Sequence, residues 1–190
     1  MSLRRPTVPE RTGISPPLEA RLPSTDGLIL PAYRDGIFWL YLIIVALVFI
    51  WYMFIMNSST KTLWYQNLQK PGTRPNPILI SILWAIIYIL LAYSTYIGHR
   101  YARSQNEQVL VNVAFALNLI LAVAWAWVFY KQRNPKVAFW ILVLLFIETL
   151  WMAWLISRIN RSAGVLFIIY AVWLAVMGWY NWQIVSLNGL

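Results

Sequence analysis

Residues 63–96 read LWYQNLQKPGTRPNPILISILWAIIYILLAYSTY, and they join a proline-rich polar loop to an apolar segment long enough to cross a bilayer. Pro71, Pro75 and Pro77 fix the backbone φ angle and remove backbone donors, so we expect a stiff, irregular loop. A loop of this kind is suited to closing over the end of a helix bundle. The apolar half begins directly after Pro77, where a helix tolerates a missing N–H.

Four further segments resemble the apolar half in length and composition. The predicted membrane spans are residues 37–56, 78–97, 109–130, 137–156 and 163–187. Hydrophobic residues make up 61% of the 190 residues and charged residues 11%, which is more apolar than a soluble domain. The sequence therefore predicts an all-α, multi-pass integral membrane protein, with a bundle of five transmembrane helices over residues 37–190. The prolines and mixed charges of residues 1–36 predict a disordered N-terminal tail.

Composition also limits the chemistry. The chain has no cysteine, which excludes disulfides, thiolate metal sites and cysteine nucleophiles, and no metal site is expected. The formal net charge is +9, but the lysines and arginines are scattered over loops rather than gathered on one element. Basic loops that flank spans face lipid phosphates, so we expect membrane lipids and no nucleic acid as partners.

Three of the predicted spans carry aromatic and polar side chains at helical spacing. These stripes are Trp84 and Tyr88 in the second span; Asn118, Ala122, Trp125 and Phe129 in the third; and Tyr170, Trp173, Met177 and Asn181 in the fifth. Two facing aromatic stripes could sandwich a plate-like ligand. The alternative is that the same aromatic residues simply pack helix against helix.

The loop and the helix after it resemble the signature of the translocator protein and tryptophan-rich sensory protein family, TspO/MBR. The resemblance rests on W-Y-x-x-L-x-K-P at residues 64–71, a proline near the next helix start, and W-x-x-x-Y at residues 84–88. The last helix supports it through Tyr170, Trp173 and Asn181, although Ile169 replaces the family's usual proline. The resemblance implies five membrane helices and affinity for porphyrins and sterols.

On this basis the expected function is a membrane receptor that binds porphyrins, or other flat hydrophobic ligands such as sterols, in a pocket under the 57–77 loop. No cofactor is required, because porphyrin is the ligand. The expected ligand-binding residues are Trp84, Tyr88, Asn118, Trp125, Tyr170, Trp173 and Asn181, and the expected lid residues are Trp64, Tyr65, Lys70, Pro71 and Pro75. The alternatives are light-dependent porphyrin degradation through Trp84 and Trp173, which would make the protein an enzyme, and a membrane transporter or scaffold.

Two further features concern contacts between helices. Glu148 is an acid deep within a span, where a charge is unfavourable; it could bind a ligand, relay protons or sit protonated, and a structural or dimer-contact role is favoured. Asn118 could serve a ligand or join two helices. A homodimer is also expected, with the small residues Ala122 and Ala126 as the candidate seam.

Overall fold

The structure, a computed structural model, describes residues 32–72 and 77–190. The chain divides into two units, residues 1–35 and 36–190. In the described residues of the first unit, 32–35, there is a 3₁₀ turn, η3 (Ala32–Arg34). The second contains α1 (Gly36–Thr60), α2 (Leu63–Asn67), α3 (Pro77–Arg100), α4 (Gln105–Tyr130), α5 (Pro135–Ser157) and α6 (Arg161–Leu187). The predictions for residues 1–31 and for Pro75 lie outside the described residues.

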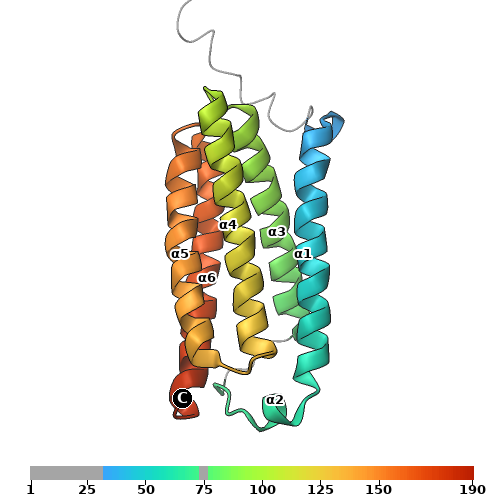
Figure 1. Ribbon diagram of the computed structural model, residues 1–190, viewed down its shortest axis with the longest axis vertical. Coiled ribbons are helices and arrows are strands. Elements are labelled where there is room, and N and C mark those ends of the chain that lie inside the picture. The colour runs from blue at the N-terminus through green and yellow to red at the C-terminus, as the bar shows by residue number, and fades with distance from the viewer. Residues whose placement is uncertain (1–31, 73–76) are drawn as a thin grey trace, which may run out of the picture. The chain divides into compact units, whose positions relative to one another are not determined.

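The five long helices form one bundle in which each helix packs on at least two others. Around the bundle α1 packs on α3, α3 on α6, α6 on α5, α5 on α4, and α4 on α1, and α3 also contacts α4 (Figure 1). The short helix α2 lies at the end of the bundle where α1 ends and α3 begins (Figure 1). This arrangement brings side chains from α1, α3, α4 and α6 together beside the 61–72 segment.

Three of the long helices, α4, α5 and α6, start where a polar side chain accepts from a free backbone N–H group. Ser104 accepts a hydrogen bond from Glu107 N at 3.2 Å, Asn134 from Val137 N at 3.1 Å, and Asn160 from Ala163 N at 3.0 Å. α3 and α5 begin with Pro77 and Pro135, which tolerate that position because their missing N–H would have no helical partner. These caps fix the short connections of the bundle.

The outer surface of the bundle is apolar. On α1 the exposed side chains Leu40, Ile43, Leu47, Ile50 and Phe54 recur every three or four residues along one face. All five long helices have the length and composition to cross a membrane. The prediction of an all-α, multi-pass membrane protein with five spans is confirmed.

Most helix ends lie within two residues of the predicted spans, but α1 and α3 end later than predicted and α4 begins at Gln105 rather than at residue 109. α1 continues to Thr60 because the Ser58 and Thr60 hydroxyls donate to the carbonyls of Ile55 and Asn57, which lets polar residues extend the last turn. α3 does not end at residue 97 as predicted but continues through Gly98 to Arg100. Gly98 is a packing residue, since an added Cβ would lie 3.1 Å from Ile156 Cγ1.

The irregular loop expected over residues 57–77 also contains regular structure. Thr62 caps the short helix α2 by accepting from Tyr65 N at 3.4 Å. The prolines that favour an irregular loop come after this helix, so no proline ring prevents residues 63–67 from forming a helical turn.

The proposed dimer seam on α4 is wrong. Ala122 and Ala126 are only 6% and 1% exposed in the single chain, because they pack inside the bundle. A small side chain at these positions permits close packing within the chain rather than against a second copy. The homodimer itself stays a prediction, with another surface required for it.

Candidate functional site

A continuous group of aromatic rings fills the loop-side end of the bundle; we call it the aromatic cluster. Its members are Tyr52 of α1; Trp64 and Tyr65 of α2; Trp84 and Tyr88 of α3; Trp125, Phe129 and Tyr130 of α4; and Trp173 of α6. Ring contacts lead from Trp64 and Tyr65 at the surface segment inward to Trp173. Four helices and the loop thus contribute to one site.

Trp84 lies at the centre of the aromatic cluster. Its ring stacks on that of Trp125 at a centroid distance of 6.1 Å and an interplanar angle of 29°. Trp173 meets Trp84 edge-on, at 5.9 Å and 84°, and Tyr88 lies 5.8 Å away on the same helix. These are the offset and edge-to-face geometries that aromatic pairs prefer, and they place three indoles from three helices in direct contact.

The aromatic faces of α3 and α6 therefore meet directly. At Trp84 and Trp173 the rings contact each other, so the two faces are not held apart as a sandwich would require. α3 and α6 also approach closely further along, where Ser94 Oγ donates to the Ala163 carbonyl at 2.7 Å. A plate-like ligand can enter only if the rings part.

Asn181 of α6 holds one of these indoles in place. Trp125 Nε1 donates to Asn181 Oδ1 at 3.3 Å, and Asn181 Nδ2 donates to the Pro135 carbonyl at the start of α5 at 2.8 Å. Asn181 is 2% exposed, so both bonds are shielded from solvent. Its amide joins α4, α5 and α6 and fixes the orientation of the Trp125 ring.

The other two indoles have buried N–H groups without acceptors. Trp84 Nε1 and Trp173 Nε1 find no hydrogen-bond partner among the described residues. Indole N–H is a donor that is normally paired when buried, because leaving it unpaired is unfavourable. Two unpaired donors on touching rings are a feature that an acceptor-bearing ligand would satisfy.

The 61–72 segment is folded tightly over the aromatic cluster. Trp64 contacts Phe129 at 6.2 Å and Tyr65 contacts Tyr130 at 6.1 Å. Lys70 Nζ donates to the carbonyls of Tyr65 and Leu68, at 2.5 and 3.1 Å, and lies 4.3 Å from the Tyr65 ring centroid. The Lys70 ammonium therefore binds loop carbonyls and helps to shape the lid.

Asn188, just beyond α6, fastens this lid. Gln69 N donates to Asn188 Oδ1 at 2.9 Å, and Asn188 Nδ2 donates to the Gln69 carbonyl at 2.8 Å. The side-chain amide thus pairs with the backbone of Gln69 in both directions. Sequence reasoning missed Asn188, because nothing in the local pattern indicates a partner 119 residues away.

Two predicted ligand residues lie deeper, away from the three indoles. Asn118 Nδ2 donates to Glu148 Oε2 and, at 3.0 Å, to Thr149 Oγ1, so it joins α4 to α5. Tyr170 is 2% exposed and has a hydroxyl without a partner among the described residues. The predicted residues thus separate into an aromatic group and a polar group.

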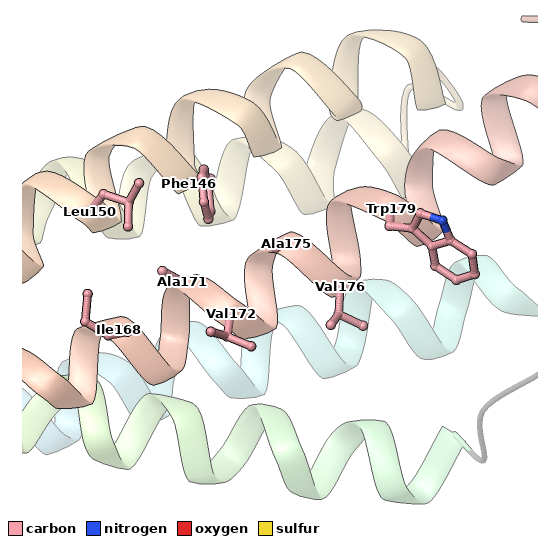
Figure 2. Close-up of a pocket in the computed structure, with 8 residues that line it drawn as sticks. All are labelled: Phe146, Leu150, Ile168, Ala171, Val172, Ala175, Val176 and Trp179. Carbon is pink, nitrogen blue, oxygen red and sulfur yellow. The ribbon is translucent and has the colours of Figure 1, made fainter.

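A groove lies between α5 and α6, apart from the aromatic cluster. This groove has a volume of about 490 Å³ and is open and apolar. Figure 2 shows its lining residues: Phe146 and Leu150 of α5, and Ile168, Ala171, Val172, Ala175, Val176 and Trp179 of α6. None of these residues belongs to the aromatic cluster, and most carry exposed side chains on the apolar exterior of the bundle. The groove is therefore separate from the aromatic cluster.

A comparison with known protein families supports the architecture of five membrane-spanning helices. The sequence model of the TspO/MBR family matches residues 39–187, which includes the five long helices and the aromatic cluster. The chain belongs to the TspO/MBR family. This confirms the resemblance noted in the loop and in the second and fifth spans.

Individual relatives are distant but cover most of the domain. Protein CrtK of Rhodobacter capsulatus is 27% identical over 126 residues, 66% of this chain and 78% of the relative. Tryptophan-rich protein TspO of Bacillus cereus is 29% identical over 125 residues, 66% of this chain and 80% of the relative. The translocator protein homolog of Schizosaccharomyces pombe is 26% identical over 141 residues, 71% and 84% respectively.

The sequence analysis did not identify three buried residues of this TspO/MBR protein that contribute to the aromatic cluster or to the contacts of Asn118. Tyr52 of α1 and Tyr130 of α4 belong to the aromatic cluster, and Thr149 accepts from Asn118. The available signal for Tyr52 was its helical spacing with Tyr41 and Val45, which are also buried. That signal is weak in α1, because apolar residues surround the helix on every side.

Proposed function

We propose that this TspO/MBR protein is a membrane receptor that binds a porphyrin or related tetrapyrrole at the aromatic cluster, beneath the 61–72 segment. The observation that carries the proposal is the pair of buried indole N–H groups of Trp84 and Trp173, which have no acceptor among the described residues. A tetrapyrrole combines a flat aromatic face with carboxylate oxygens at its edge. Its faces suit stacking on indole and its oxygens suit the unpaired donors.

The closed packing of the cluster defines what binding requires. Trp84 and Trp125 are stacked on each other, so the ligand replaces part of this ring contact with its own. Of the three indoles Trp125 is tied to Asn181, whereas Trp84 and Trp173 are held by packing alone. The rings that lack polar partners are therefore the ones that shift toward the ligand.

Tryptophan fluorescence measures this binding directly. Titrating protoporphyrin into the purified protein should quench the emission saturably, and Trp84→Phe/Trp173→Phe should weaken the affinity about tenfold, because two hydrogen bonds worth about 0.5–1.5 kcal/mol each are lost. Trp140→Phe is the matched control, since Trp140 is an exposed indole on α5. An unchanged titration in the double variant refutes the site.

The outer α5–α6 groove is the competing location. Ala175→Phe fills the groove without touching the aromatic cluster, because Ala175 is an exposed lining residue. If the proposal is correct, this variant binds protoporphyrin as the unaltered protein does. If Ala175→Phe abolishes binding while Trp84→Phe/Trp173→Phe retains it, the ligand occupies the groove. A sterol, which lacks an extended aromatic face, would be expected to favour the groove.

A second candidate function is light-dependent degradation of the bound porphyrin. The edge-on contact of Trp84 and Trp173 at 5.9 Å favours it, because adjacent indoles can pass an electron to a photoexcited macrocycle while oxygen serves as the oxidant. Illuminating the aerobic complex should then convert the porphyrin absorption spectrum into that of a new product. A spectrum that stays intact under illumination identifies a binding protein without this activity.

A further inference from the structure

A second buried group lies near the middle of the bundle, at the contact of α4, α5 and α6; we call it the polar cluster. It consists of Asn118, Glu148, Thr149 and Tyr170, which are 0%, 6%, 0% and 2% exposed. Glu148 lies well within α5, which spans Pro135–Ser157, so its carboxyl group is far from both ends of the helix. Ionisable groups at this depth are unfavourable unless they are paired.

The hydrogen bonds of the polar cluster are unbalanced. Asn118 Nδ2 uses its two hydrogens on Glu148 Oε2 and Thr149 Oγ1. Asn118 Oδ1 and Glu148 Oε1 have no partner among the described residues. Both unpaired atoms are acceptors, and they belong to two side chains that are already joined by a hydrogen bond. The Asn118–Glu148 pair therefore lacks a hydrogen atom rather than an oxygen, whereas the Tyr170 hydroxyl, which also has no partner among the described residues, can both donate and accept.

Among the described residues, no positively charged side chain pairs with Glu148. From α6 the titratable group that faces it is the neutral phenol of Tyr170. From α4 the group facing Glu148 is the neutral amide of Asn118. A carboxylate here would be a charge in the apolar interior next to an unpaired carbonyl oxygen, and both features are unfavourable.

We propose that Glu148 and Asn118 form a buried proton-binding site. A proton carried on Glu148 Oε1 is donated to Asn118 Oδ1 while Asn118 Nδ2 donates back to Glu148 Oε2, which closes a cyclic acid–amide pair between α5 and α4. One proton removes the net charge and satisfies both unpaired acceptors. Release of that proton breaks one of the two bonds and restores the charge, so proton occupancy controls how firmly α4 is joined to α5.

Infrared spectroscopy detects the proton itself. At neutral pH the protein in lipid should show the C=O stretch of a protonated carboxylic acid, and Glu148→Gln should remove it. Glu107→Gln is the control: Glu107 lies at the start of α4, where its carboxylate accepts from Arg103 N, so this variant should retain the band. A band that is absent from the unaltered protein, or that survives Glu148→Gln, overturns the proposal.

Thermal stability provides an independent test, because glutamine reproduces the protonated pair without a titratable proton. Its amide can donate to Asn118 Oδ1 and accept from Asn118 Nδ2, so Glu148→Gln should melt at the same temperature as the unaltered protein at neutral pH. Raising the pH should lower the melting temperature of the unaltered protein more than that of the variant, since only the former loses a proton. Stabilisation by sodium ions that depends on Glu148 would instead identify a cation site and refute the proton.

Discussion

The indoles of the aromatic cluster and the Asn118–Glu148 pair of the polar cluster lack opposite halves of a hydrogen bond among the described residues. In the aromatic cluster the unpaired atoms include two donors, the indole N–H groups of Trp84 and Trp173. In the polar cluster the unpaired atoms include two acceptors, Asn118 Oδ1 and Glu148 Oε1. The first arrangement suits a ligand with oxygen acceptors and the second suits a proton. Unmet hydrogen-bonding capacity thus indicates what each site binds more clearly than residue type alone.

Asn181 and Asn118 sharpen this contrast because they are buried residues of the same type. Asn181 both accepts from Trp125 and donates to the Pro135 carbonyl. Asn118 donates twice, while its oxygen remains unpaired. Asn181 therefore has the hydrogen bonding of a structural residue. The side-chain oxygen of Asn118, in contrast, lacks a donor among the described residues.

The largest expected loss of stability comes from a substitution in α6, the helix that contributes residues to both clusters. Gly164→Ala would place a Cβ 1.9 Å from Ser157 Oγ and 2.8 Å from Ser157 Cα, so the backbones of α5 and α6 must separate. We expect a loss of about 3 kcal/mol in the free energy of unfolding, at the upper end for overpacking. Gly178→Ala is the matched control, because no atom lies within 4 Å of its added Cβ. Equal melting curves for the two variants would contradict this account of the α5–α6 contact.

The next substitution tests whether the polar cluster and the aromatic cluster act independently. Asn118→Leu removes the donor to Glu148 and Thr149, and a buried group left unpaired costs about 1–3 kcal/mol of stability. Combining it with Glu148→Leu should restore most of that loss, because both partners are then apolar. Porphyrin quenching should remain unchanged in the double variant. Loss of quenching would show that the two clusters form a single site.

The two clusters differ in how far their residues and contacts could be predicted from the sequence. The spans and most of the aromatic cluster were predicted, because long apolar runs fix the helices and helical spacing fixes their faces. The partner of Asn118 was not predicted, because its face of α4 could turn toward α3 or α5, and only helix packing decides between them. Asn188 and Tyr52 were missed for the same reason: their roles depend on contacts between distant segments.

A smaller effect concerns the orientation of Trp125. Asn181→Leu removes its hydrogen bond and that to the Pro135 carbonyl, and contacts between membrane helices of this kind contribute about 0.6 kcal/mol each, up to about 2. We expect a melting temperature a few degrees lower and weaker protoporphyrin binding, because the stacking partner of Trp84 is no longer fixed. If porphyrin affinity is unaffected by Asn181→Leu, Trp125 does not help to form the site.

The smallest effect on stability concerns the lid. Asn188→Ala breaks both hydrogen bonds to the backbone of Gln69, which lies on an exposed segment, so the global stability should change by less than about 1 kcal/mol. Hydrogen exchange in residues 61–72 should nevertheless accelerate, and protoporphyrin should bind faster. Asn67→Ala, an exposed change on the same segment, is the control. Unchanged exchange in Asn188→Ala would show that Asn188 does not fasten the lid.

The indole N–H resonances of the protein test the contrast between the clusters most directly. With isotope-labelled tryptophan, NMR can follow the twelve indoles, and Trp84→Phe and Trp173→Phe assign the two that matter. We predict that protoporphyrin shifts both of these resonances to the positions of hydrogen-bonded N–H groups and leaves that of exposed Trp140 unchanged, in the unaltered protein and in Glu148→Gln alike. Resonances of Trp84 and Trp173 that stay in place while the ligand binds would contradict the account.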